Sequence, residues 1–415
     1  MSSKGLTGNW TDVVLVDGAR TPFVDYNGGL SQISPIDMGI KAGKAAIAKS
    51  RLPADDIGSV ICGNMAQASF DAFLLPRHIG LYCGAPQETP AHLVQRVCGT
   101  GIEIIAQAAD TISLQRADLA LVVGAESMSR NPIAAYTHRG GFRLGQVEFK
   151  DFLWEALMDT GVSCNMGDTA ENLAKRFNIT RAEVDTFAAR SFARAIAAKE
   201  SGFFKGEITP VTNETFEREG MNSRGIRLRA RDEVIDADTH IRPSPYEVLA
   251  KLRPAFGGVQ TGGNSSAIVD GAAAALVASA AYVKAKGVKP LAYVRAWATV
   301  GVDPKVMGIG PVPAIRAVLD RAGLSLSRID RFEINEAFGA QAMACARDLG
   351  IDEDKLNVNG GAIAIGHPLG ATGVRLCLTL SRELIAKGLR YGVASACIGG
   401  GQGIAMLIEN AQSRD

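Results

Sequence analysis

Short strand-like runs alternate with helix-like segments at both ends of the chain, and this alternation constrains the fold more than any other feature. In the first part, β-branched runs at residues 13–17, 59–63 and 119–124 are separated by segments with helical spacing at 35–49 and 102–114. Strands that alternate with helices form a sheet that the helices cover. We therefore predict an α/β fold for this part.

The same alternation returns in the last part of the chain. Strands are predicted at residues 291–299, 331–335, 391–397 and 404–409, and helices at 313–322, 339–348 and 371–387. An Ala-rich stretch at residues 267–281 is interpreted as a buried helix because alanine has the highest helix propensity. Two α/β parts predict a duplicated core, although the sequence shows no strong internal repeat.

The middle of the chain has a different composition. Residues 127–257 are richer in charged, aromatic, Pro and Arg residues and contain a predicted helix pair at 169–177 and 181–201. Thr180 followed by Glu183 forms a capping-box pattern before the second helix. We interpret this region as an inserted loop domain. The predicted division is an N-terminal half at 1–126, the inserted loop domain at 127–257, a return to the N-terminal half at 258–288, and a C-terminal half at 289–415.

Charge and cysteine content narrow the classes of function. The formal net charge is +1, which gives no overall attraction to nucleic acid or a membrane surface, and no apolar run is long enough to span a bilayer. The seven cysteines are scattered without a C-x-x-C pair, so we expect reduced thiols and no metal site. The first ten residues lack the features of a signal or transit peptide, and we expect a cytoplasmic protein.

Two residues at predicted loop–helix junctions could perform acid–base or nucleophilic chemistry. Cys98 lies in R-V-C-G-T-G directly before a predicted helix, where free N–H groups and the helix dipole lower a thiol pKa. The alternative is a small buried hydrophobic residue. His367 lies in G-H-P after a glycine-rich loop and could act as a general base. The alternative is a solvated loop histidine, and local context leaves both choices open.

Three further segments contain candidate residues. Cys397 ends a strand and enters I-G-G-G-Q-G, whose backbone N–H groups could bind a developing oxyanion. Asn335 ends a strand before E-A-F and could orient a water or a substrate oxygen. Ser266 belongs to N-S-S-A, which we interpret as the start of the Ala-rich helix and a contact for an amide-bearing ligand. The alternative for Cys397 is a glycine-rich connection with a buried thiol. The alternative for Asn335 and for Ser266 is an ordinary helix start.

In this order, C-G-T-G, N-S-S, N-E-A-F, G-H-P and C-I-G-G-G-Q-G resemble the active-site blocks of thiolases. Further matches are A-R-T-P, G-A-E-S-M, K-L-R-P-A-F and M-G-I-G-P, so the resemblance covers residues 13–409. It implies an α/β fold with a duplicated five-layer α/β/α/β/α core and an inserted loop domain. It also implies coenzyme A thioesters as substrates, coenzyme A without another bound cofactor, and a homodimer or homotetramer.

The resemblance also implies a role for each matching residue. Cys98 would be the acyl-accepting nucleophile, His367 would accept its proton, and Cys397 would move the proton at the α-carbon. Asn335 would hold a water in a first oxyanion hole with His367. The amides of Cys98 and Gly399 would form a second oxyanion hole. Ser266 would contact the pantetheine arm.

Two positions depart from the family pattern. Short-chain members typically have His-Met-Gly in the loop domain, whereas this chain has Asn165, Met166 and Gly167. We expect Asn165 and Met166 to lie at the substrate site and to admit acyl groups longer than two carbons. Val269 occupies a position where many relatives have Asn, and the sequence offers no interpretation of it.

The arginines of the inserted region are candidates for binding coenzyme A phosphates, because a guanidinium suits phosphate. Among them, we select Arg242 of the I-R-P segment as the candidate phosphate contact. The alternative is that these arginines are solvated and pair with nearby acidic residues.

The resulting prediction is a β-ketothiolase that cleaves 3-ketoacyl-CoA or catalyses the reverse condensation. The alternatives are a strict acetoacetyl-CoA thiolase, a β-ketoacyl synthase-like condensing enzyme and a non-catalytic CoA- or lipid-binding relative. Cys397 and the N-E-A-F segment that begins at Asn335 argue against the condensing enzyme. The presence of Cys98, His367 and Cys397 together argues against a non-catalytic relative.

Overall fold

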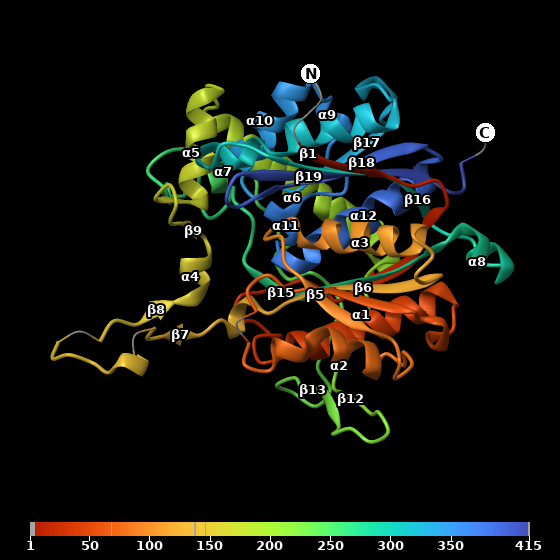
Figure 1. Cartoon of the computed structure of the whole chain (residues 1–415). Helices are drawn as coiled ribbons and strands as arrows, with labels where there is room; N and C mark the ends of the chain where they lie inside the picture. The colour runs from red at the N-terminus through yellow and green to blue at the C-terminus, as the bar shows by residue number, and fades with distance from the viewer. Residues whose placement is uncertain (1–4, 68, 137, 146, 414–415) are drawn as a thin grey trace.

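Two half-sheets and three helical layers form the core of the computed structural model, which describes residues 5–67, 69–136, 138–145 and 147–413 (Figure 1). In the N-terminal half-sheet the strand order is β2-β15-β6-β4-β5, with β3 paired to β15. Its strands are β2 (Val13–Arg20), β3 (Val24–Asp25), β4 (Ser59–Gly63), β5 (Ala91–Val94), β6 (Leu119–Glu126) and β15 (Val269–Ser279).

The C-terminal half-sheet has the order β17-β18-β19-β16, with β1 paired to the other edge of β16. Its strands are β1 (Gly5–Asn9), β16 (Ala292–Gly301), β17 (Arg331–Ile334), β18 (Tyr391–Ile398) and β19 (Gln402–Asn410). The two half-sheets touch through a short antiparallel pairing of β2 with β16, at Leu15 with Ala292 and Val14 with Tyr293.

Helices form the other three layers. In Figure 1, α1 and α2 lie below the N-terminal half-sheet, α3 and α12 lie between the two half-sheets, and α9 and α10 lie above the C-terminal half-sheet. The bounds are α1 (Pro35–Ser50), α2 (Leu75–Tyr82), α3 (Thr100–Ser113), α9 (Pro311–Ala322), α10 (Gly339–Leu349) and α12 (Leu369–Lys387). The predicted α/β/α/β/α layering is confirmed.

The two halves repeat one topology. In the N-terminal half, β2 is followed by α1, β4, α2, β5, α3, β6 and β15, and in the C-terminal half β16 is followed by α9, β17, α10, α12, β18 and β19. The counterpart of β5 is reduced to one isolated parallel bridge between Phe332 and Leu356. The central helices α3 and α12 therefore occupy equivalent places in the two halves.

The chain between β6 and β15 leaves the sheet and returns, because these two strands are neighbours in it. Its helices are α4 (Phe152–Ala156), α5 (Met166–Arg176), α6 (Arg181–Glu200) and α7 (Tyr246–Leu249). Its ribbons pair β7 (Ile133–Ala134) with β8 (Lys150–Asp151), β9 (Met158–Asp159) with β10 (Cys164–Asn165), β11 (Val211–Thr212) with β14 (Val234–Ile235), and β12 (Glu214–Phe216) with β13 (Arg224–Ile226). The predicted domain limits stay a prediction.

One predicted element is wrong. The Ala-rich stretch at residues 267–281 is not a helix but contains strand β15, which pairs with β2 on one side and β6 on the other. Strand pairing overrides helix propensity here because the strand is buried on both faces, between α1 on one side and α3 with α12 on the other. The short helix α8 (Ala280–Ala285) begins only after Ser279, which caps it.

The other predicted strands and helices are present, with ends that differ by three residues or fewer. Both predicted helices of the inserted region begin with a capping box, at Asn165 with Asp168 and at Thr180 with Glu183. Among the described residues, no helix has the length and apolar character needed to cross a bilayer, and no cluster of His, Cys, Asp and Glu could hold a metal ion.

Candidate active site

A cavity of about 450 Å³ lies where the central helices meet the inserted region, and Cys98 and His367 lie on its wall. Most of the remaining wall is apolar, with side chains from the inserted region and the loops of both halves. Among these lining residues are Met128, Trp154, Leu157, Met166, Phe256 and Phe338. Such an enclosure favours an apolar ligand with few polar groups.

Cys98 occupies a strained turn between β5 and α3. Val97, the residue before it, has φ of 44°, a left-handed conformation that costs a β-branched residue about 1–3 kcal/mol. The Thr100 hydroxyl stabilises this turn, since it accepts a hydrogen bond from Arg96 N at 2.9 Å and donates one to Val97 O at 2.6 Å. The turn directs the Cys98 side chain to the cavity.

The thiol of Cys98 is not the low-pKa group that its position before a helix predicts. Burial raises its pKa to about 11, even though backbone N–H groups of Gly399 and of Cys98 itself lower it. The loss of solvation outweighs these N–H groups because only 7% of the residue is exposed. The resting side chain is therefore a neutral thiol, and a thiolate must form by proton transfer to a nearby base.

His367 has the protonation state of such a base. Burial and then the charge of Arg375 lower its pKa to about 3, so the imidazole is neutral at physiological pH. Its Nδ1 lies 2.6 Å from the Thr372 hydroxyl, which donates to Pro368 O at 3.3 Å. Nδ1 therefore carries the proton, and the lone pair on Nε2 is the basic position.

Asn335 lies beside this lone pair at the end of β17. Its Nδ2 is 3.3 Å from His367 Nε2, while its Oδ1 is buried and has no hydrogen-bond partner among the described residues. The predicted proximity of Asn335 and His367 is present in the structure.

Cys397 lies one layer behind the cavity wall. It is fully buried at the end of β18 and packs with Met307 and Ala337, which do line the cavity. Burial raises the pKa of this thiol well above its ordinary value, and proximity to Cys98 raises it further. The two thiols and the imidazole thus converge from three segments far apart in the sequence.

The remaining candidates divide into two groups. Ser266 and Met166 line the cavity, and Gly399 donates its N–H to the Cys98 sulfur. Asn165 is the N-cap of α5 and is not among the described residues on the cavity wall, and Arg242 is exposed outside that wall. Their contribution to substrate binding stays a prediction.

Ser266 does not start a helix as expected. It precedes strand β15, and its N–H donates to Ala337 O at 3.0 Å, which joins the segment to the one that follows Asn335. The position of Val269 also has a structural explanation. A Cβ on Gly366 would lie only 2.6 Å from the methyl groups of Val269, and Gly366 has φ of +105°. Val269 therefore fills the space beside the residue that precedes His367.

A buried carboxylate that sequence reasoning missed connects the loops around the cavity. Glu126 Oε2 accepts hydrogen bonds from Met65 N at 2.9 Å and Gly370 N at 2.8 Å, and Oε1 accepts from Ala66 N at 3.1 Å and Asn64 Nδ2 at 3.0 Å. It thereby joins the loop after β4 to the first turn of α12. The signals in the sequence are an acidic residue that ends an apolar run and the G-A-E-S-M match that contains it, and neither indicates these hydrogen bonds.

Sequence reasoning also missed His240 and Asp25, which both line the cavity. They lie 215 positions apart, and their side chains are in contact. Nothing in the local sequence of either residue indicates this contact.

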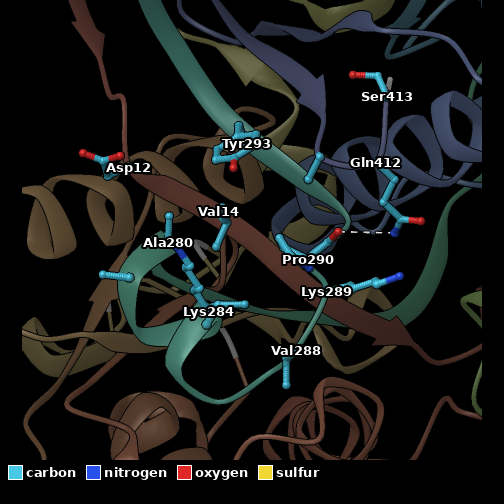
Figure 2. A pocket seen from close by; sticks show the side chains of 13 residues that line it. Asp12, Val14, Ala280, Lys284, Val288, Lys289, Pro290, Tyr293, Gln412 and Ser413 are labelled. Carbon is cyan, nitrogen blue, oxygen red and sulfur yellow. Dashed lines mark hydrogen bonds between the residues drawn. The ribbon is translucent and has the colours of Figure 1, made fainter. Parts of the chain in front are cut away.

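A second hollow is separate from this site. Figure 2 shows the side chains that line it. It has a volume of about 810 Å³ and lies where α8, the start of β16 and the C-terminal segment meet. Gln412 closes one side through a hydrogen bond to Pro290 O at 3.4 Å. None of its lining residues lines the cavity with Cys98, and none is a predicted site residue.

A duplicated α/β core in which a thiol and an imidazole line one cavity, with a second thiol directly behind its wall, is an arrangement suited to acyl transfer through a cysteine. Two family models match the chain, the thiolase N-terminal domain over residues 13–281 and the thiolase C-terminal domain over residues 288–410. The chain belongs to the thiolase family.

Individual relatives agree with this assignment. The mitochondrial 3-ketoacyl-CoA thiolase of Homo sapiens is 42% identical over 96% of this chain and 98% of its own length. The beta-ketothiolase BktB of Cupriavidus necator is 41% identical over 96% of this chain and 99% of its own. The solved human mitochondrial enzyme in complex with CoA has a TM-score of 0.91 at 41% identity and covers 99% of this chain and 100% of its own.

The cytoplasmic location expected from the N-terminal residues is contradicted by these relatives. The similar proteins from human, orangutan and cattle are mitochondrial, while others are bacterial.

Proposed function

We propose that this protein is a β-ketothiolase that cleaves 3-ketoacyl-CoA with coenzyme A and catalyses the reverse condensation through an acyl-cysteine. The observation that carries the proposal is that Cys98 and His367 line one cavity and that the Cys397 thiol lies directly behind its wall, close to Cys98. Relatives named 3-ketoacyl-CoA thiolase, beta-ketothiolase and acetyl-CoA acetyltransferase support it.

In the first half-reaction, the Cys98 thiol gives its proton to His367 and attacks the 3-keto carbon of the substrate. The bond between C2 and C3 breaks, the acyl group stays on Cys98, and the electron pair moves to the enolate of acetyl-CoA. Cys397 donates a proton to C2, and acetyl-CoA leaves.

In the second half-reaction, the thiol of coenzyme A gives its proton to the Cys397 thiolate and attacks the carbonyl carbon of the acyl-cysteine. The bond between that carbon and the Cys98 sulfur breaks, His367 returns its proton to Cys98, and the product is an acyl-CoA shortened by two carbons. Both the enzyme intermediate and the product are thioesters, so neither step crosses a large energy gap.

Two oxyanion sites assist these steps. The backbone N–H groups of Cys98 and Gly399, which already point at the sulfur, bind the oxyanion that forms on the acyl carbon. Asn335 holds a water, and this water and His367 together form the second site, which binds the thioester oxygen of the enolate. No other bound cofactor takes part in this scheme.

The substrate contacts follow from the same arrangement. Ser266 contacts the pantetheine arm, Met166 contacts the acyl part from the first turn of α5, and Asn165 fixes that turn. Arg242 contacts the phosphates outside the cavity. We also propose that the protein assembles as a homodimer or homotetramer, as the family resemblance implies.

Intact-protein mass spectrometry after incubation with acetyl-CoA tests the proposed function. The parent protein gains one acetyl group, and Cys98→Ala gains none. Cys164→Ala is the matched control, because this half-buried cysteine does not line the cavity, and it gains the acetyl group like the parent. An adduct that persists in Cys98→Ala would mean that another residue is the nucleophile.

A further inference from the structure

The cavity opens to solvent along a path that begins at His367. The backbone N–H of His367 donates a hydrogen bond to the backbone carbonyl of Ala267 at 3.0 Å, and 8% of Ala267 is exposed. The next residue, Ile268, is 40% exposed, and its carbonyl accepts a hydrogen bond from Tyr26 N at 3.0 Å. Exposure therefore rises from the imidazole to the rim, which Asp25 and Tyr26 of the β3 segment form together with Ile268.

An aspartate–histidine pair lies at this rim. Asp25 Oδ1 is 2.5 Å from His240 Nδ1, and Thr239 Oγ1 donates to the other carboxylate oxygen at 2.7 Å. Phe192 packs near the imidazole, with 5.9 Å between ring centroids. The Asp25 carboxylate and the Phe192 ring thus fix the orientation of His240.

This geometry identifies the atom of His240 that remains for a ligand. Because a carboxylate lies 2.5 Å from Nδ1, that nitrogen carries a proton, and the hydrogen-bonding position left is Nε2. No described residue forms a hydrogen bond with Nε2, although the imidazole lines the cavity. Arg242, whose guanidinium is 3.0 Å from Nδ1, lies on the same side of the ring as Asp25 and leaves Nε2 free.

We propose that the Asp25–His240 pair is a subsite for an amide of the pantetheine arm of the acyl-CoA substrate. This inference rests on the proposed function. A thioester bound at Cys98 and His367 must leave the cavity through the rim, and the arm that follows the sulfur is an apolar chain interrupted by amides. The wall around it is largely apolar, so a polar group at the rim selects for those amides.

An amide suits His240 better than a phosphate does. A neutral imidazole accepts a hydrogen bond from an amide N–H, and a protonated one donates to the amide C=O, so either form binds it. A phosphate oxygen accepts only, and it therefore needs the protonated form.

Calorimetric titration of coenzyme A and of pantetheine into the parent protein and into His240→Leu tests the proposal. Loss of one neutral hydrogen bond should weaken the binding of both ligands by about fivefold. His240→Gln, which restores a hydrogen-bonding group, should recover most of the affinity. His92→Leu is the matched control, because His92 lies on β5 outside the cavity, and it should bind both ligands like the parent.

Kinetics with three acetoacetyl thioesters complete the test. With His240→Leu, KM should rise for the CoA and pantetheine thioesters and stay unchanged for the S-ethyl thioester, which lacks amides. For all three substrates, kcat should stay within twofold of the value for the parent protein. A change for CoA alone would assign the contact to phosphate and overturn the proposal, as would a change for all three substrates or for none.

The calorimetric result also separates this inference from the proposed function. A parent protein that turns over no 3-ketoacyl thioester, yet binds pantetheine through His240, would refute the proposed function and leave the subsite standing. A parent that is active, with unchanged pantetheine affinity in His240→Leu, would refute the subsite alone.

Discussion

Gly101 and Gly373 are in backbone contact near the N-terminal ends of the two central helices, α3 and α12. A Cβ on Gly101 would lie 2.6 Å from Gly373 N, and a Cβ on Gly373 would lie 2.2 Å from Ile102 N. Cys98 precedes α3 and His367 precedes α12, so this contact between equivalent helices brings the nucleophile and the base proposed here to one place. The duplication of the fold thereby generates a two-sided site.

Gly101→Ala should therefore reduce activity as well as stability. A methyl group at this contact forces the helices apart and should cost about 1–3 kcal/mol of unfolding free energy. Because small displacements of reacting groups are costly, we expect kcat to fall at least about tenfold. Thermal unfolding and steady-state thiolysis measure the two effects. Gly140→Ala, where the added methyl meets nothing within 4 Å, is the control. Unchanged kcat in Gly101→Ala would show that the contact does not position the site.

Much of this arrangement was predictable, and the exceptions have physical reasons. The strand–helix alternation and the local signals at Cys98 and His367 are properties of short segments. Strand β15 was missed because its pairing with β2 and β6 comes from distant parts of the chain and outweighs the preference of alanine for helices. Short windows of sequence cannot reveal such pairings.

The contacts of single side chains were less predictable. In the sequence, Glu126 is only the last residue of an apolar strand. Its four hydrogen-bond donors belong to the loop after β4, about 60 positions away, and to the first turn of α12, 244 positions away. The raised pKa of Cys98 depends on how deeply the tertiary structure buries it. Local sequence indicated the helix terminus correctly but contains no measure of the burial that opposes it.

Alkylation of Cys98 should depend steeply on pH. With a thiol pKa of about 11, the thiolate is the minor form at neutral pH and increases with rising pH. The rate of modification by iodoacetamide, mapped to Cys98 by peptide mass spectrometry, should increase about tenfold per pH unit from pH 7 to pH 9. Cys164 in the same digest is an internal reference. A rate that stays level between pH 6 and pH 8 would instead indicate a resting thiolate–imidazolium pair.

Cys397→Ser should separate the two proposed chemical steps. The substitution leaves Cys98 and its turn intact, so acetylation by acetyl-CoA should persist. A serine hydroxyl is a far weaker acid than a thiol, so the exchange of acetyl-CoA methyl protons with deuterated water should fall by at least about 100-fold. Proton NMR follows the exchange, and mass spectrometry follows the acetylation. Exchange at the parent rate would refute the role proposed for Cys397.

The cavity should accept acyl chains longer than two carbons, although the reasons differ from those that the sequence suggested. Asn165 caps α5 and is not among the residues that line the cavity, so it does not enlarge the cavity. The apolar wall does the selecting, and it includes Trp154 and Leu157 of the inserted region.

Each buried methylene contributes about 0.8 kcal/mol, which corresponds to roughly a fourfold gain in kcat/KM until the cavity is full. We therefore expect 3-ketohexanoyl-CoA to be cleaved at least as efficiently as acetoacetyl-CoA. Leu157→Trp narrows the cavity and should lower kcat/KM for the six-carbon substrate more than for the four-carbon one. Leu144→Trp, on a fully exposed position, should leave the ratio unchanged. A parent enzyme that cleaves acetoacetyl-CoA but not the six-carbon substrate would be a strict acetoacetyl-CoA thiolase. The cavity of about 450 Å³ would then hold parts of the substrate other than a longer acyl chain.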